Sequence, residues 1–301
     1  MLNRKNKLLL LKVLSLFSVV RGYNILVIAL AQYLASIYIL SPNLPLRQVV
    51  FDVNLFVIVI ASAMVIAGGY IINNFYDAEK DLINKPRKSM LDRLVSQRFK
   101  LTTYFVLNFM AVIAASYVSF RAVFFFSSYI FGIWLYSHKL KKIPLLGNFI
   151  SATLAITPFF VVFVYYRNFE TVIFVHAFFL FLLILAREMI KDLENISGDI
   201  AQNYSTIPII YGAKTSKTII SLLILLTLLP SLLLIFKFDV GYMNFYFTIC
   251  VLLLVLFIFL LSRAETKKDY VWLHNILKLI IVGGVFSILL IDVDLVLNRI
   301  L

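Results

Sequence analysis

Long apolar runs dominate the chain, and short polar segments separate them. Nine of these runs are candidates for crossing a bilayer, which takes about 20 apolar residues per helix. They are residues 22–40, 51–72, 101–119, 122–137, 148–166, 171–186, 218–236, 243–261 and 275–297. In hydrocarbon each run must be helical, because a bare loop or an open strand edge would leave backbone N–H and C=O groups without partners. The pattern predicts an all-α polytopic membrane protein with nine transmembrane helices.

The segment before the first run behaves differently. Residues 1–21 combine a basic start with an apolar stretch that Lys12 interrupts, and no small-residue cleavage site follows. This is typical of a helix lying at the membrane interface rather than of a removed signal peptide. We expect one domain over residues 1–301, with this interfacial segment at its start.

Composition and charge support a membrane protein and suggest its orientation. Hydrophobic residues make up 62% of the 301 and charged residues 14%, whereas soluble domains average about 45–50% and about 25%. The formal charge is +13, and 22 of the 28 Lys and Arg residues fall in one set of alternate loops against five in the other. By the positive-inside rule we expect the N-terminus and loops 73–100 and 187–217 on the cytoplasmic side of the plasma membrane, and the C-terminus on the outside. Cys250 is the single cysteine, which excludes an intrachain disulfide or a cysteine metal site.

Two acidic clusters end the second and sixth runs at the cytoplasmic side. Each has a helical spacing that would align its polar side chains on one face. Like charges aligned in this way repel one another, so a bound cation is the favoured explanation. The first cluster has spacing i, i+4, i+8 and the second i, i+4, i+7, i+11: Asn73, Asp77 and Asp81, and then Glu188, Asp192, Asn195 and Asp199.

The donor atoms indicate which cation. Oxygen ligands without His or Cys suit Mg²⁺, which typically binds one or two carboxylates together with substrate phosphate oxygens. Lys85, Arg87 and Lys88 follow the first cluster and would meet the remaining phosphate charge. Either cluster alone would be equally typical of a solvated helix end, but two matched clusters favour a magnesium diphosphate site. Its expected metal ligands are Asn73, Asp77, Asp81, Asp192 and Asp199.

At these residues the chain resembles the UbiA superfamily of intramembrane prenyltransferases. Its first motif, NxxxDxxxD, matches Asn73, Asp77 and Asp81, and the second cluster approximates its second motif. Within the superfamily the chain looks most like the branch that prenylates geranylgeranylglyceryl phosphate in ether lipid synthesis. The stretches that resemble this branch are residues 73–86 and 187–192, whereas residues 136–148 carry features of the superfamily as a whole. Asn195, Asn203 and Ser205 depart from that branch, which usually has Asp, Gly and Arg there.

The resemblance implies a fold and a reaction. Nine helices would form two pseudo-repeated halves around a central cavity, which the two cytoplasmic loops would cap. Two Mg²⁺ ions would bridge the donor diphosphate, and a lipophilic acceptor would attack the prenyl carbon. The partners are then a prenyl diphosphate, the acceptor and membrane lipid, with no nucleic acid and no protein partner expected. The catalytic carboxylates would be those of Asp77, Asp81, Asp192 and Asp199.

Further residues are candidates for substrate binding, each with an alternative structural role. Lys141 and Lys142 would hold an anionic acceptor head, whereas Lys85 or Arg87 would bind the donor; lysines of this kind also anchor cytoplasmic loops. Asn24 would contact substrate or make a helix–helix hydrogen bond. Aromatic rings near the motifs would stabilise a carbocation or simply lie at the interface. The remaining candidates are Asn73, Lys88, Glu188, Asn195, Tyr76 and Tyr136.

The sequence leaves other functions open. The same site could prenylate an aromatic, quinone-type acceptor. A polytopic transporter would also contain acidic residues, but carriers generally place them near the bilayer midplane, whereas here they end the runs. A scaffold that sequesters an isoprenoid would need the pocket but not both clusters.

Overall fold

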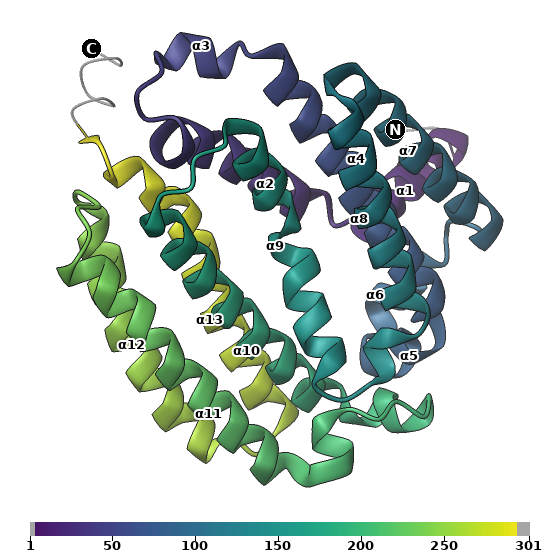
Figure 1. Cartoon of the computed structure of the whole chain (residues 1–301). Helices are drawn as coiled ribbons and strands as arrows, with labels where there is room; N and C mark the ends of the chain where they lie inside the picture. Colours follow the sequence, from purple (N-terminus) through teal and green to yellow (C-terminus); the bar gives the residue numbers. More distant parts are fainter. Residues whose placement is uncertain (1–3, 294–301) are drawn as a thin grey trace.

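The computed structural model describes residues 4–293, and every regular element in that range is a helix. Nine of these helices are long and apolar enough to cross a membrane (Figure 1), which confirms an all-helical integral membrane protein. They are α2 (Gly22–Ala35, extended by a π-helical turn to Leu40), α4 (Val53–Tyr76), α7 (Gln97–Val118), α8 (Phe120–His138), α9 (Leu146–Tyr166), α10 (Thr171–Ala201), α11 (Ile207–Phe236), α12 (Met243–Arg263) and α13 (Lys267–Ser287).

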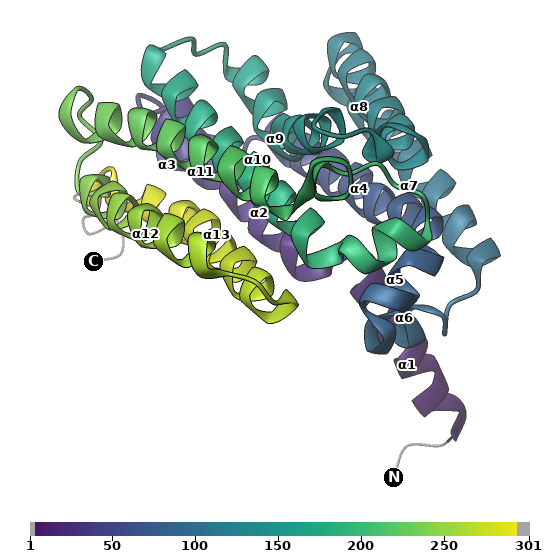
Figure 2. The ribbon, with the colours of Figure 1, turned by 90° about the horizontal axis from the view of Figure 1, so that it is seen from below.

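Two large buried apolar clusters form most of the core, and a small third one joins α9 to α10. One joins α10, α11, α12 and α13, with Leu183, Ile220 and Phe247 among its fully buried members. The other joins α4, α7 and α8, around Ile58, Ala111 and Phe126. Figure 2 shows α12 and α13 on one side of the molecule and α4, α7 and α8 on the other, with α2, α9 and α10 between them. The site described below is therefore built where the two groups meet.

Besides two 3₁₀ turns, Leu140–Lys142 and Ile288–Leu290, four shorter α-helices complete the described chain. They are α1 (Arg4–Val19), α3 (Leu46–Val50), α5 (Ala78–Asn84) and α6 (Pro86–Asp92). The last two follow α4 directly, and Pro86 explains why they are separate. A proline disfavours helical geometry in the residue before it, and Lys85 is not helical, with φ of −139° and ψ of 61°.

A buried polar network holds α6 against the bundle. The Asp92 carboxylate accepts hydrogen bonds from Ser18 of α1 (3.2 Å) and from the Asn74 amide of α4 (3.1 Å). Lys100 of α7 donates to the Asn74 side-chain oxygen at 2.9 Å. Asp92 and Lys100 are only 3% and 1% exposed. Because buried polar groups are costly unless they are hydrogen-bonded, this network fixes where the segment after the first motif ends.

The segments expected as cytoplasmic loops are mostly helical. Residues 73–100 contain α5 and α6, and α10 continues past residue 186 to Ala201, so that only residues 202–206 separate it from α11. Apolar runs detect the part of a helix that lies in hydrocarbon, and the polar continuation of α10 lacks that signal.

The ninth transmembrane helix begins earlier than its apolar run suggests. It starts at Lys267 rather than at residue 275, because Thr266 and Asp269 form a capping box at its N-terminus. Residues 294–297 of the predicted span lie outside the described residues.

Candidate functional site

The two acidic clusters lie at the same end of the bundle, because α5 packs against the C-terminal part of α10. Asp77 sits at the junction between α4 and α5. Its N–H still donates to the Asn73 carbonyl (2.9 Å), and the Asp81 N–H donates to the Asp77 carbonyl (2.8 Å). These i to i+4 hydrogen bonds keep the helical register through the break, so the spacing expected from the sequence is retained.

Asp77 is held by side chains from two distant segments. Nζ of Lys141 lies 2.6 Å from its Oδ1, and the Tyr204 hydroxyl donates to the same oxygen at 2.9 Å. Lys141 also donates to Oδ1 of Asn73 at 3.5 Å. Burial of Asp77 opposes its ionisation, but the charges of Lys141 and Lys80 and these hydrogen bonds hold the pKa of Asp77 below its usual value. The carboxylate is therefore kept ionised in a site where it is only 9% exposed.

Lys80 connects the first cluster to the second. It forms an ion pair with the fully buried Asp199, and Asp77 and Asp192 also attract its charge. Nζ of Lys80 lies 4.3 Å from the Tyr204 ring centroid. Burial opposes the charge of Lys80, but Asp199 and Asp77 raise its pKa above the usual value. A single ammonium group thus stands among carboxylates from both clusters.

The other two acids of the second cluster face α9. Nδ2 of Asn148 donates to Oδ2 of Asp192 at 2.7 Å. Oε2 of Glu188 accepts from Ser151 (3.1 Å) and lies 2.6 Å from Nζ of Lys191. α10 therefore aligns these side chains as the i, i+4 spacing predicted.

Asn195 continues the same face of α10. Its amide donates to the Lys191 carbonyl at 2.7 Å. Its Oδ1 is buried and has no hydrogen-bond partner among the described residues. Buried oxygens are nearly always partnered. An unpartnered one in this place can accept a hydrogen bond from a ligand.

The expected phosphate-binding residues lie around the carboxylates but are less tightly paired. The nearest carboxylate oxygens are 4.0 Å away for Lys85 (Glu194) and 3.9 Å for Lys88 (Asp92), and Arg87 is exposed. Burial lowers the pKa of both lysines. Each would therefore gain from an anionic ligand that restores a partner for its charge.

The remaining candidates occupy three positions. Nζ of Lys142 lies 5.2 Å from the Tyr204 ring centroid, and Tyr76 is 5.8 Å from Nζ of Lys141. Tyr136 of α8 is partly buried near Ser151 and Glu188. The Asn24 amide donates to the Tyr70 hydroxyl at 3.1 Å, so Asn24 makes the helix–helix hydrogen bond that was its alternative role.

Several residues in the site were not singled out from the sequence. Tyr204 follows the second cluster, but its partner Asp77 lies 127 residues away, so no local pattern indicates the contact. Lys80 lies inside the first acidic run, and its positive charge among three carboxylates could have marked it. Asn148 and Ser151 lie on α9, whose apolar run indicates a span and not a site.

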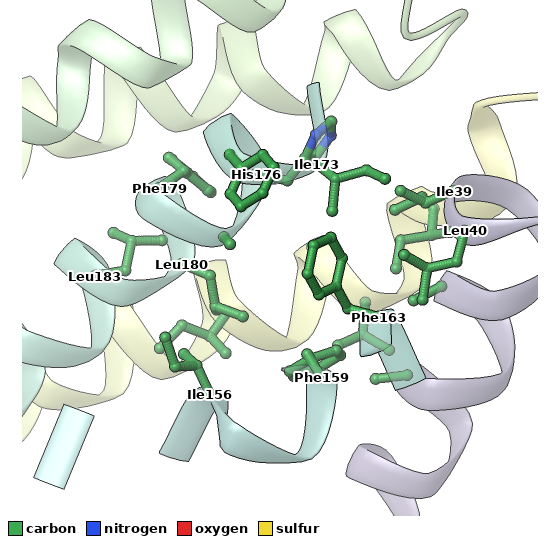
Figure 3. Close-up of a pocket in the computed structure, with 18 of the residues that line it drawn as sticks. Ile39, Leu40, Ile156, Phe159, Phe163, Ile173, His176, Phe179, Leu180 and Leu183 are labelled. Atoms are coloured by element: carbon green, nitrogen blue, oxygen red, sulfur yellow. The ribbon is translucent and has the colours of Figure 1, made fainter. Parts of the chain in front are cut away.

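An apolar cavity lies at the end of the bundle opposite the acidic clusters. It has a volume of about 140 Å³ and is lined by α2, α9, α10, α12 and α13 (Figure 3). Phe159 and Phe163 of α9 and Phe179 of α10 are among its walls, and His176 and Tyr246 bring polar groups to a mostly apolar lining. This cavity is set toward the other membrane face, and a second hollow of about 470 Å³, lined in part by Phe75 and Tyr76, lies beside the first motif.

The residues present suit Mg²⁺. Within residues 4–293, no three or more His, Cys, Asp or Glu side chains are close enough to hold a metal by themselves. Mg²⁺, however, typically uses one or two protein carboxylates and completes its shell with substrate phosphates and water. Three features suit a bound cation. The donors are all oxygens, Oδ1 of Asn195 has no partner among the described residues, and ammonium groups already stand beside Asp77 and Asp199.

Comparison with protein families gives one match over most of the chain. The model of the UbiA prenyltransferase family matches residues 30–279. A curated relative from Methanobrevibacter smithii, named digeranylgeranylglyceryl phosphate synthase, is 29% identical over 262 residues, which are 83% of this chain and 88% of that protein.

Solved structures share the fold. A UbiA homologue from Archaeoglobus fulgidus bound to GPP and Mg²⁺ superimposes with a TM-score of 0.66 at 13% identity, covering 91% of this chain and 99% of that one. A UbiA homologue from Aeropyrum pernix K1 in its apo form gives 0.64 at 13% identity, with 95% and 98% covered.

Proposed function

Since the chain belongs to the UbiA prenyltransferase family, we propose that it transfers a prenyl group from a prenyl diphosphate to the free hydroxyl of geranylgeranylglyceryl phosphate. The chain is an integral membrane prenyltransferase, and the acceptor is the part that is proposed. Support comes from relatives named digeranylgeranylglyceryl phosphate synthase, one of which aligns over 83% of the chain. The alternative of a transporter has no comparable support, because the carboxylates lie just after α4 and in the polar C-terminal part of α10, beyond the apolar runs, rather than at mid-span.

One observation carries the placement of the chemistry. The Lys80 ammonium stands among carboxylates of both motifs, paired with Asp199 and attracted by Asp77. The arrangement holds positive charge between two helices from different halves of the molecule. This is the charge distribution that a cation-assisted diphosphate site requires.

We assign the metal-binding role to the oxygens of both motifs. When bound, Mg²⁺ supplies positive charge that neutralises the departing diphosphate. The Asn148 amide orients Asp192, and the Tyr204 hydroxyl orients Asp77. The five proposed ligands are Asn73, Asp77, Asp81, Asp192 and Asp199.

The basic residues would bind the phosphate groups of the two substrates. Lys85 and Lys88 are half-buried and loosely paired, so a phosphate oxygen would improve the electrostatic environment of each. Arg87 and Lys142 are exposed at the edge of the site. Lys141 already reaches Asp77 and Asn73, which brings the segment after α8 onto the first motif.

The reaction needs the reacting carbon to be shielded from water. The carbon–oxygen bond to the diphosphate breaks, the acceptor hydroxyl oxygen forms the new ether bond, and the departing diphosphate would take up the hydroxyl proton. The faces of Tyr76 and Tyr136, both close to the carboxylates, would stabilise developing positive charge on the prenyl carbon. The apolar cavity and the interior of the bundle would receive the hydrocarbon tails.

The proposal includes an orientation. The uneven distribution of Lys and Arg supports a position of α1, α5 and α6 on the cytoplasmic side of the plasma membrane. Water-soluble metal ions and released diphosphate would then exchange with the cytoplasm.

Purified protein in detergent or nanodiscs tests the reaction directly. Labelled geranylgeranyl diphosphate and geranylgeranylglyceryl phosphate should yield a Mg²⁺-dependent diether product, identified by mass spectrometry. Chelation should abolish product formation, and added Mg²⁺ should restore it. Turnover of a hydroxybenzoate or naphthoate, with none of the glycerol phosphate lipid, would refute the proposed acceptor while leaving prenyl transfer intact.

A further inference from the structure

Asn84, the last residue of α5, is a buried contact between the two motif segments. It is 7% exposed. Its Nδ2 donates to the Asn195 carbonyl at 3.3 Å, and its Oδ1 accepts from the Gly198 N–H at 3.2 Å. Its own carbonyl accepts from Nζ of Lys267, at the start of α13, at 3.0 Å. One side chain therefore bonds α5 to the α10 backbone at two points, both inside the second motif.

Gly198 makes this close approach possible. A Cβ built on Gly198 would lie 2.7 Å from Cγ of Asn84 and still closer to Nδ2. Ordinary carbon contacts begin near 3.4 Å, so any side chain at position 198 would collide with Asn84. The Asn84 side chain cannot simply rotate away, because hydrogen bonds hold both of its polar atoms.

The contact lies one helical turn from the ion pair that joins the motifs. Lys80 and Asn84 are four residues apart on α5, so they project from the same face. Lys80 meets Asp199, and Asn84 meets Gly198, which precedes Asp199 in the chain. The depth at which Asn84 seats on α10 therefore sets how far Asp77 and Asp81 stand from Asp192 and Asp199.

We propose that Asn84 and Gly198 form a positioning clamp that sets the separation of the two carboxylate motifs. Neither residue contacts substrate in this role, which rests on the proposed function of the site between the motifs. The clamp acts through the carboxylates that it places. Such sites require their groups to be held within about 0.5 Å of the productive geometry.

The size of the expected effect follows from the geometry. Relief of the collision in Gly198→Ala requires α5 to move by about 1 Å, and misplacement of that size can lower a catalysed rate by about 100-fold. We therefore expect kcat of Gly198→Ala to fall by about 100-fold, with a much smaller change in KM for the acceptor. Ser197→Ala is the matched control, because Ser197 is the exposed neighbour on the same helix, and its rate should stay near that of the wild type.

A double-mutant cycle separates the clamp from a general packing defect. Asn84→Ala removes the atoms that the new methyl group would meet, so Gly198→Ala should cost little more in that background. The thermal shift produced by Mg²⁺ with inorganic diphosphate gives a readout independent of turnover. That shift should shrink in Gly198→Ala, while the Tm without ligand reports whether the variant folds.

Two outcomes would overturn the clamp. One is a Gly198→Ala rate and ligand-induced shift equal to those of the wild type. The other is an equal loss from Gly198→Ala with and without Asn84, since the effect would then not pass through this contact. If wild-type protein shows the Mg²⁺-diphosphate shift but does not prenylate geranylgeranylglyceryl phosphate, the proposed acceptor fails and the thermal-shift cycle still decides the clamp.

Discussion

Nζ of Lys141 lies 2.6 Å from Oδ1 of Asp77, although the two residues are 64 positions apart in the chain. The contact joins the short segment between α8 and α9 to the first motif. Asp77 therefore has a positive partner within the protein itself. A bound cation and a phosphate group would have to share this position with the lysine, and the following variants test how the charges are divided.

The carboxylates of both motifs should be needed for turnover. Asp77→Asn, Asp81→Asn, Asp192→Asn and Asp199→Asn should each lower kcat by about 100-fold or more, as expected when one preorganised electrostatic group is removed. Glu79→Gln is the control, because Glu79 is exposed and accepts a hydrogen bond from Gln202 at 3.2 Å. Near wild-type rates with normal Mg²⁺ dependence in two of the four Asp variants would show that the site is wrongly assigned.

The two lysine pairs should affect the binding of different substrates, because the pairs come from different segments. Removing Lys141 and Lys142 together, as Gln, should raise KM for the acceptor at least about tenfold and change KM for the donor less. Lys85→Gln with Lys88→Gln should do the reverse. Loss of a charge-assisted contact costs about 1.5–3 kcal/mol, and about 1.4 kcal/mol is tenfold in affinity.

Steady-state kinetics with each substrate varied in turn measures both constants. Lys139→Gln serves as control, since Lys139 is exposed and adjacent in sequence. Equal changes in both constants for both pairs would argue against separate phosphate positions.

The orientation predicts which cysteines a membrane-impermeant reagent labels. On a Cys250→Ser background, Met90→Cys and Ser197→Cys should react only from the cytoplasmic side, and Glu170→Cys only from the outside. All three positions are exposed. Labelling of the first two from opposite sides would contradict the shared location of the two motifs.

The network around Asp92 should contribute to stability more than to chemistry. Asp92→Ala removes an acceptor for Ser18 and Asn74 and leaves buried polar groups without partners, which costs about 3 kcal/mol. The detergent-solubilised variant should unfold at a lower temperature. Asp92→Asn retains an acceptor, so its Tm should fall less. An unchanged Tm in Asp92→Ala would mean that other contacts hold α6.

The membrane-spanning part of the fold could be predicted from the sequence, because hydrocarbon leaves the backbone only one solution for each apolar run. The motif residues could be found because helical spacing aligns them. The limits are equally physical. The polar extension of α10 to Ala201 carries no hydropathy signal, and the start of α13 depends on a cap at Thr266 and not on apolar residues.

The contacts within the site could not be derived in the same way. Tyr204 meets Asp77, and Asn84 meets Gly198, across more than a hundred residues in each case. Such pairs depend on how α5 settles against α10, which is decided by packing over the whole bundle. Spacing along one helix predicts which side chains share a face but not what that face will touch.

The origin of each counter-ion bears on how the protein is inserted during synthesis. Asp77 is paired with Lys141, and both precede α10, so the N-terminal half can enter the bilayer with this acid already neutralised. Asp199 depends on Lys80 from that earlier half. Because an unpaired charge near the membrane is costly, we expect the ion pair of Asp199 to form only once the earlier segment that carries Lys80 is in place.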